Sequence, residues 1–271
     1  MADQVDEAAL QTLIEAARAA GELALAFFHP GARTTAIVEE KPGGSPVTEA
    51  DYLVDRFLKE RLEAAFPQAG WLSEETADTN ERLTRADVLI VDPIDGTRGY
   101  AAGDRRWAIS IALVRDGRPE AGVVHAPALG ETYAAVRGGG ALLNGARIHV
   151  SKRGAMAGGA LGGPRPLCDA LARGGLAVTL PDRIPSLAYR MACVASGALD
   201  AALSGPNAAD WDIAAADLIV TEAGGVFQGE NGAVPVYNGV DPHHGALIAA
   251  APSLHAEMRT ALAQLKARRA I

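Results

Sequence analysis

The sequence predicts a mixed fold, with an α+β N-terminal half, an α/β C-terminal half and an active site between them. Two amphipathic helices come first, at about residues 7–28 and 49–66, because their apolar residues recur with helical spacing. Strands between turn signals follow, at residues 106–114, 120–126 and 131–137. After about Ser151, helices and strands alternate, which is typical of an α/β arrangement. We therefore expect one subdomain over residues 1–150 and a second over residues 151–271.

The elements of the second half follow from the same patterns. Helices are predicted at residues 165–173, 185–196, 211–223 and 253–268, and strands at residues 175–180 and 246–250. Residues 181–185 begin and end with proline and are predicted to form a loop. Gly138-Gly139-Gly140 lacks the lysine and hydroxyl residue that follow in a P-loop, so a turn is expected there. His243-His244 is interpreted as a loop before the last strand and not as a metal site.

Composition and charge narrow the classes of protein. The chain has 271 residues, 49% of them hydrophobic, which is enough for two layered subdomains with substantial cores. Its net charge of −8, from 25 basic and 33 acidic residues, argues against binding of a nucleic-acid polymer through a broad basic surface. A local basic pocket for a small phosphate is compatible with this charge.

The first helix and the cysteines favour a cytoplasmic protein. Residues 8–28 carry Glu15, Arg18 and Glu22, so we expect an amphipathic helix and neither a signal peptide nor a membrane span. Cys168 and Cys193 have no close pairing in the sequence, and they are expected to be small core residues in a reducing compartment.

The most informative motif is Asp92-Pro93-Ile94-Asp95-Gly96-Thr97, which follows the apolar run at residues 88–91. The run is the pattern of a buried strand, which we expect to end at Asp92, before Pro93. Gly96-Thr97 can begin a helix whose unpaired N–H groups face an anion. Carboxylates for a hard cation beside an anion site indicate metal-assisted phosphoryl chemistry. The alternative is an ordinary strand-to-helix turn in which Asp95 caps the helix.

Two further acidic clusters favour the metal interpretation. Glu74 and Glu75 are adjacent, and a partly buried pair of carboxylates calls for a cation to offset its repulsion. Alone, the pair is better interpreted as a solvated acidic turn or the start of a helix. Asp212 falls in the first turn of the helix predicted at residues 211–223, which Gly224-Gly225 ends. It could complement the helix dipole or supply a third carboxylate to a metal.

Taken together, these motifs resemble the inositol monophosphatase superfamily of magnesium-dependent, lithium-sensitive phosphomonoesterases. The resemblance spans most of the chain and rests on the motif at residues 92–97, on Trp-Asp-Ile-Ala-Ala followed by Glu-Ala-Gly-Gly within residues 211–225, and on the upstream Glu-Glu pair. It implies a layered α/β/α/β/α sandwich of the sugar-phosphatase type, two or three Mg²⁺ ions and a small phosphorylated metabolite as substrate. No membrane or nucleic-acid partner is expected. Dimers are frequent among inositol phosphatases, whereas bisphosphate nucleotidases are often monomeric, so a homodimer stays open.

Carried over position by position, the resemblance assigns two metal sites. One metal would be held by Glu74, Asp92 and the backbone carbonyl of Ile94. The second would be held by Asp92, Asp95 and Asp212, with Asp92 bridging the two ions. All of these ligands are oxygen atoms, which suits Mg²⁺.

The resemblance also assigns the phosphate contacts and the residues that activate water. Backbone N–H groups of Gly96 and Thr97 would hold the substrate phosphate. Asp51 would act with the Thr97 hydroxyl to orient and activate the attacking water. Locally, Thr48 and Asp51 also form the pattern of a helix capping box, and the two roles are compatible because a cap fixes Asp51 in space.

The substrate is predicted from details around these motifs. Ser73 before the Glu-Glu pair resembles the bisphosphate nucleotidases, since inositol phosphatases usually have glycine there. Gly205 lies seven residues before Asp212, where inositol phosphatases commonly carry a glutamate that binds ring hydroxyls. We therefore predict hydrolysis of 3'(2'),5'-bisphosphate nucleotides, such as 3'-phosphoadenosine 5'-phosphate to AMP. The alternatives are an inositol-1-monophosphatase of broad specificity and a non-catalytic binding protein on the same fold.

Basic residues offer candidate substrate contacts. Lys41 matches a basic position near the metals, in a segment rich in glutamate and glycine. Arg165, Arg183 and Arg190 lie in the C-terminal half, where substrate recognition is expected. One of these arginines could meet a second phosphate; the simpler interpretation of each is a solvated surface residue.

Overall fold

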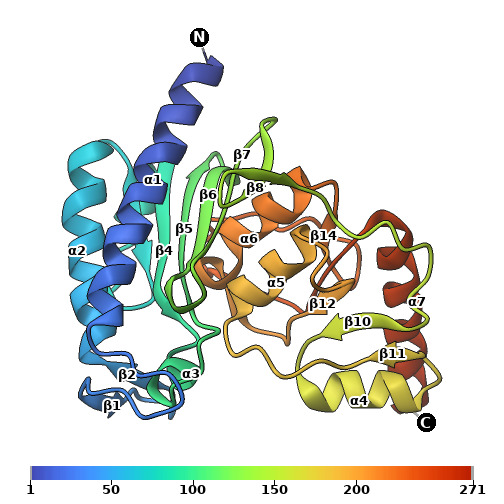
Figure 1. Ribbon diagram of the computed structural model, residues 1–271. Helices are drawn as coiled ribbons and strands as arrows, with labels where there is room; N and C mark the ends of the chain where they lie inside the picture. Colours follow the sequence, from blue (N-terminus) through green and yellow to red (C-terminus); the bar gives the residue numbers. More distant parts are fainter. Residues whose placement is uncertain (1, 270–271) are drawn as a thin grey trace.

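The computed structural model describes residues 2–269, and the side chains of residues 7–268, as two β-sheets with helices on their faces (Figure 1). The larger sheet contains β3 (Gly70–Ser73), β4 (Asp87–Asp95), β5 (Ala108–Arg115), β6 (Arg118–Ala126), β7 (Glu131–Val136), β8 (Gly140–Leu143) and β9 (Ala146–Ile148). Its strands lie in sequence order, so neighbours in the chain are neighbours in the sheet. β3 and β4 are parallel, and the other pairs are antiparallel.

The smaller sheet is mixed and contains β10 (Gly159–Gly162), β11 (Val178–Thr179), β12 (Ala201–Leu203), β14 (Val226–Gly229) and β16 (Leu247–Ala250). Its order is β11-β10-β12-β16-β14, with β10 parallel to both of its neighbours. Two short antiparallel pairs complete the strands: β1 (Val38–Glu40) with β2 (Pro46–Thr48), and β13 (Ala208–Ala209) with β15 (His243–His244). The predicted boundary after residue 150 falls between β9 and β10.

The helices lie between the two sheets and on their outer faces. They are α1 (Ala2–Leu25), α2 (Glu49–Ala65), α3 (Thr97–Ala101), α4 (Arg165–Arg173), α5 (Leu187–Ala195), α6 (Asp210–Glu222) and α7 (Pro252–Arg269), with 3₁₀ turns at Glu81–Thr84 and Pro127–Leu129. α1 and α2 cover one face of the larger sheet, α5 and α6 lie between the sheets, and α4 and α7 cover the far face of the smaller sheet (Figure 1). This arrangement confirms the predicted α/β/α/β/α sandwich.

Strand β4 lies inside the larger sheet and is buried on both faces. Leu89 and Val91 belong to the core that α1 and α2 form with the sheet. Val88 and Ile90 belong to the core on the opposite face, with α5 and α6. Successive side chains of a strand point to opposite faces, so a strand covered on both sides reads as an unbroken apolar run.

The end of β4 differs from the prediction. The strand does not stop at Asp92 but continues to Asp95, with an irregularity in its pairing with β5 between these two residues. Pro93 lacks an N–H group and is tolerated in an interior strand at such a bulge. The expectation was wrong because proline was taken to end the strand, whereas the irregularity in the pairing of β4 with β5 accommodates it.

Three other boundaries differ from the prediction. The first helix ends at Leu25 and not near residue 28, because the N–H groups of Phe27 and Phe28 bond three residues back in a tightened last turn. The strand expected at residues 175–180 is only the two-residue β11. His243-His244, expected as a loop, is β15, whose backbone pairs with Ala208-Ala209.

Several smaller expectations are confirmed. The glycine triplet forms a turn, and the N–H groups of Gly138 and Gly140 donate to the carboxylate of Glu222, each at 2.8 Å. Both cysteines, Cys168 and Cys193, are buried thiols without a disulfide. Within the described part of the chain, no helix combines the length and the apolar character needed to cross a membrane.

Candidate active site

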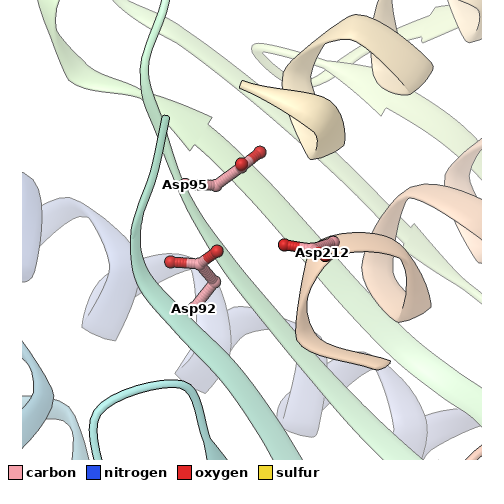
Figure 2. A group of neighbouring side chains, drawn as sticks. All are labelled: Asp92, Asp95 and Asp212. Carbon is pink, nitrogen blue, oxygen red and sulfur yellow. The ribbon is translucent and has the colours of Figure 1, made fainter. Parts of the chain in front are cut away.

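Three carboxylates from two distant parts of the chain meet beside the end of β4. Asp92 and Asp95 come from β4 and Asp212 from the first turn of α6 (Figure 2). One oxygen of each lies within 4.8 Å of the others. Asp92 and Asp95 are 1% and 5% exposed, so the group sits in a region from which most water is excluded.

Asp212 is fixed by its place in α6. Its Oδ2 accepts a hydrogen bond of 2.8 Å from the backbone N–H of Ala209, the residue before the helix. This bond satisfies one of the free N–H groups of a helix N-terminus. The bond holds the Asp212 side chain at the start of α6, where its carboxylate also belongs to the cluster.

Asp95 is held by the N-terminus of α5, a contact that sequence reasoning missed. Its carboxylate accepts hydrogen bonds from the Ser186 hydroxyl and from the N–H groups of Leu187 at 3.1 Å and Ala188 at 2.6 Å. Ser186 is the N-cap of α5, and its hydroxyl also accepts from Tyr189 N–H. A serine ahead of an apolar helix is a recognisable cap signal. Nothing in the sequence, however, indicates that the cap also binds an aspartate more than ninety residues away.

Asp51 and Thr97 form a second buried pair. The Thr97 hydroxyl lies 3.0 Å from Oδ1 of Asp51 and 2.9 Å from the carbonyl oxygen of Ile94, so its single proton is shared between two acceptors. The other oxygen of Asp51 accepts from the N–H of Thr48 at 2.8 Å, which confirms the predicted capping box at the start of α2. Burial raises the pKa of Asp51 to about 6, against the hydrogen bonds from Thr48 and Thr97.

Lys41 supplies the cation that the adjacent glutamates require. Its Nζ lies 2.9 Å from Oε1 of Glu74 and 2.6 Å from Oε1 of Glu75. The Glu75 side chain is almost fully buried, and burial raises its pKa to about 7. Glu74 is more open, and its charge acts on Asp92, where it is one of the causes of a raised pKa.

The electrostatics of the cluster suit a hard divalent cation. Burial, followed by repulsion from neighbouring carboxylates, raises the pKa of Asp92 and of Asp212. Burial also raises the pKa of Asp95, although the bonds from α5 oppose this. A divalent cation would remove the repulsion, and oxygen donors without histidine or cysteine are those that Mg²⁺ prefers. The residues therefore fit Mg²⁺.

The predicted arginine contacts lie in different surroundings. Arg165, on α4, is exposed and pairs with Asp169 at 2.9 Å. Arg190, on α5, is buried, and the charges of Asp95 and Asp212 act on it. Gly205 lies in the loop after β12, and a Cβ built there would meet nothing within 4 Å. The structure thus brings Arg190 close to the carboxylates and leaves Arg165 at the surface.

Comparisons with known proteins agree with this geometry. The chain is 32% identical over 235 residues to a 3'(2'),5'-bisphosphate nucleotidase CysQ of Aggregatibacter actinomycetemcomitans, covering 80% of this chain and 83% of that protein. It is 36% identical over 240 residues to a histidinol-phosphatase of Mycobacterium tuberculosis, covering 83% and 87%. Among solved structures, an inositol monophosphatase (IMPase) of Thermotoga maritima superposes with a TM-score of 0.82 at 28% identity, covering 98% and 99%.

The family model called "Inositol monophosphatase family" matches residues 4–267, almost the whole chain. That match, the layered sandwich and the carboxylates gathered at the end of β4 agree with one another. The chain therefore belongs to the inositol monophosphatase family and is a phosphoric monoester hydrolase that acts on small phosphorylated substrates.

Proposed function

We propose that this enzyme is a lithium-sensitive phosphatase of 3'(2'),5'-bisphosphate nucleotides, which converts 3'-phosphoadenosine 5'-phosphate to AMP. The observation that carries the chemistry is the gathering of Asp92, Asp95 and Asp212 within 4.8 Å of one another, beside the Asp51–Thr97 pair. The similarity to the CysQ nucleotidase supports the substrate.

The metal ligands in this proposal are those that the family pattern assigns: Glu74, Asp92, the carbonyl of Ile94, Asp95 and Asp212. Two Mg²⁺ ions, or three, would supply Lewis-acid activation of a water and neutralise charge on the phosphoryl oxygens. The Glu74 carboxylate also pairs with Lys41. This lysine must therefore release Glu74, or share it, when the site is loaded.

The protein's own residues would position the nucleophile and the phosphate. A water beside Thr97 would donate a proton toward the Thr97 hydroxyl, whose own proton already points to Asp51 Oδ1 or to Ile94 O. The Asp51 carboxyl has a pKa of about 6, so it is ionised in most enzyme molecules at neutral pH and can accept that proton. Gly96 has a φ of 91°, which turns the chain sharply into α3 and exposes the N–H groups of its first turn to a phosphate.

Space at the leaving-group side favours the nucleotide. Because residue 205 is glycine, no glutamate side chain is present there to bind sugar hydroxyls. A Cβ built on Gly205 would meet no atom within 4 Å, so the space beside this residue is open. Ser73, before the glutamate pair, donates to Asp55 and so braces the strand end that carries Glu74. An inositol-1-monophosphatase of broad specificity is the second candidate, because the fold matches the Thermotoga IMPase along nearly all of both chains.

The test is phosphate release with Mg²⁺ from three substrates: 3'-phosphoadenosine 5'-phosphate, inositol 1-phosphate and histidinol phosphate. We expect kcat/KM to favour the nucleotide by at least about 100-fold, which corresponds to about 2.7 kcal/mol in the transition state. Preference for the inositol ester would reject the nucleotidase and favour the second candidate. Millimolar lithium is expected to inhibit turnover, and unaltered activity at that concentration would argue against the lithium sensitivity proposed here.

A further inference from the structure

Arg82 is a buried arginine whose donors reach two distant parts of the chain. It lies on the 3₁₀ turn at Glu81–Thr84 and is only 2% exposed. Its Nε and Nη2 donate to Oδ2 of Asp78 at 3.0 and 2.7 Å. Its Nη1 donates to Oδ1 of Asn238 at 2.7 Å and to the carbonyl oxygen of Gly239 at 3.0 Å. Burial of a guanidinium is costly unless its donors are bonded, so moving either partner away would be unfavourable.

One partner of this guanidinium belongs to the segment that begins with Glu74. Residues 74–80 form neither helix nor strand, so individual bonds place the segment. Near its start, Thr76 Oγ1 donates to Oδ2 of Asp55 on α2 at 2.6 Å. Near its end, Asp78 accepts the two bonds from the buried guanidinium. The segment therefore has two side-chain anchors, and the arginine supplies the second.

Asn238 connects Arg82 to the start of α6. Its backbone N–H donates to Oδ2 of Asp210 at 2.8 Å, while its side chain accepts from Arg82. Asp210 is the first residue of α6 and is fully buried. Its other oxygen, Oδ1, lies 2.6 Å from Nε2 of His244. Asp212 follows in the same turn of the helix, so a shift of Asp210 would move Asp212 with it.

These bonds form one connected path between the two proposed carboxylate ligands that do not come from β4. Asp92 and Asp95 belong to the same strand, which fixes the spacing between them. Glu74 and Asp212 come from separate elements, and the negative charge of Glu74 acts on Asp212. Because like charges repel, the elements that carry these two carboxylates need bonds that hold them in place. The path through the buried guanidinium supplies such bonds.

We infer that Arg82 is a positioning residue, which ties the segment beginning at Glu74 to the start of α6 and so sets where Asp212 lies relative to Glu74. The inference rests on the ligand set of the proposed function. A metal site needs its ligands held within about 0.5 Å of the productive geometry. Loss of contacts that support metal ligands typically lowers metal affinity by about 10- to 100-fold. Since Arg82 touches neither ligand, we expect an effect at the lower end of this range.

The test measures Mg²⁺ binding to the substrate-free protein by titration calorimetry. Arg82→Lys keeps a positive charge, but an ammonium lacks the planar fork that bonds Asp78 and Asn238 together. Asn238→Gly removes the side-chain acceptor and keeps the N–H that bonds Asp210, and glycine suits the φ of 60° at this position. We expect each variant to raise the Kd for Mg²⁺ by about 10-fold.

The double variant tests whether Arg82 and Asn238 act through one link. Because Arg82→Lys and Asn238→Gly interrupt the same path, their effects on the Kd should not multiply. We expect the double variant to raise the Kd by no more than about threefold beyond the larger single effect. An increase of about 100-fold, the product of two independent effects, would overturn the shared link.

A destabilised control separates positioning from folding. Leu262 is a buried residue of α7, the helix on the far face of the smaller sheet (Figure 1). Leu262→Ala should lower the urea midpoint in EDTA and leave the Kd for Mg²⁺ at the wild-type value. If Arg82→Lys and Asn238→Gly also keep the wild-type Kd, Arg82 serves only the stability of the fold and the inference is rejected. If Arg82→Lys does not fold, Asn238→Gly alone decides by the same criterion.

Glu74→Gln and Asp212→Asn distinguish a failure of this inference from a failure of the ligand set. If both variants bind Mg²⁺ with the wild-type Kd, the proposed ligand set is wrong and the inference falls with it. If both weaken Mg²⁺ binding while the Arg82 and Asn238 variants do not, the ligand set stands and only the inference is rejected.

Discussion

Replacing Asp212 by asparagine should raise the free energy of unfolding of the metal-free protein. The same substitution should lower the activity of the enzyme with Mg²⁺. One carboxylate oxygen of Asp212 lies within 4.8 Å of one each from Asp92 and Asp95; those two side chains are buried, and Asp212 is half-buried. The substitution keeps the shape of the side chain, and its oxygen can still accept the hydrogen bond from Ala209 N–H. The main change is therefore the loss of one negative charge from the cluster.

The size of the gain follows from Coulomb's law. Two unit charges 4.8 Å apart repel by about 3.5 kcal/mol at an effective dielectric constant of about 20. The oxygens lie no farther apart than this, and asparagine removes two of the three repelling pairs, so the repulsion removed at full ionisation is at least about 7 kcal/mol. The raised pKa values mean that protonation already relieves much of this repulsion at neutral pH. We therefore expect a gain of about 1–3 kcal/mol in the free energy of unfolding.

The assay is urea unfolding at pH 7, in EDTA and in excess Mg²⁺. In EDTA the Asp212→Asn protein should unfold at a higher urea concentration than the wild type. Mg²⁺ should stabilise the wild type by about 2.7 kcal/mol at one hundred times its Kd, and the variant by clearly less. Glu60→Gln, which removes an exposed carboxylate on α2, should change neither comparison. A variant less stable than wild type in EDTA, or equally stabilised by Mg²⁺, would refute the reasoning.

Other positions around the site and in the core give matched tests. Asp95→Asn should lower kcat by about 100-fold or more while the thermal unfolding stays cooperative, and near-normal turnover would remove Asp95 from the metal site. Gly96→Ala should lower the free energy of unfolding, measured in urea, by about 2 kcal/mol more than Gly130→Ala does. Both glycines have a positive φ, but only at Gly96 would a Cβ meet backbone, 2.9 Å from Ser186 N. Asp217 is buried against Tyr237, and burial raises its pKa from 3.8 to about 6. Because the folded state disfavours the ionised carboxylate, ionisation of Asp217 lowers the stability of the protein above pH 6. This loss of stability fades as the pH falls toward 3.8. Asp217→Asn should therefore gain up to about 3 kcal/mol over wild type at pH 7 in EDTA and little at pH 4; a gain that grows toward low pH would contradict this sign.

Sequence reasoning recovered the elements whose causes are local. The apolar run at residues 88–91 and the capping box of Thr48 and Asp51 depend on a few neighbouring residues, and both are present. The same local reasoning failed at Pro93, because a proline that ends an isolated strand is accommodated by a bulge when β5 pairs alongside. It also failed at His243-His244, since strand pairing there depends on Ala208-Ala209 being brought alongside.

By itself, the sequence determined which chemistry was available: clustered carboxylates, a Gly-Thr turn after a buried strand, and no histidine or cysteine set for a softer metal. These are local properties, because residue type, periodicity and capping act over a few positions. Only the tertiary structure decided that Asp95 and Asp212 meet, that α5 holds Asp95, and that Arg190 is buried within reach of the charges of both aspartates. Such contacts join residues far apart in the chain, and they are set by how two sheets and the helices between them pack, which no short stretch of sequence encodes.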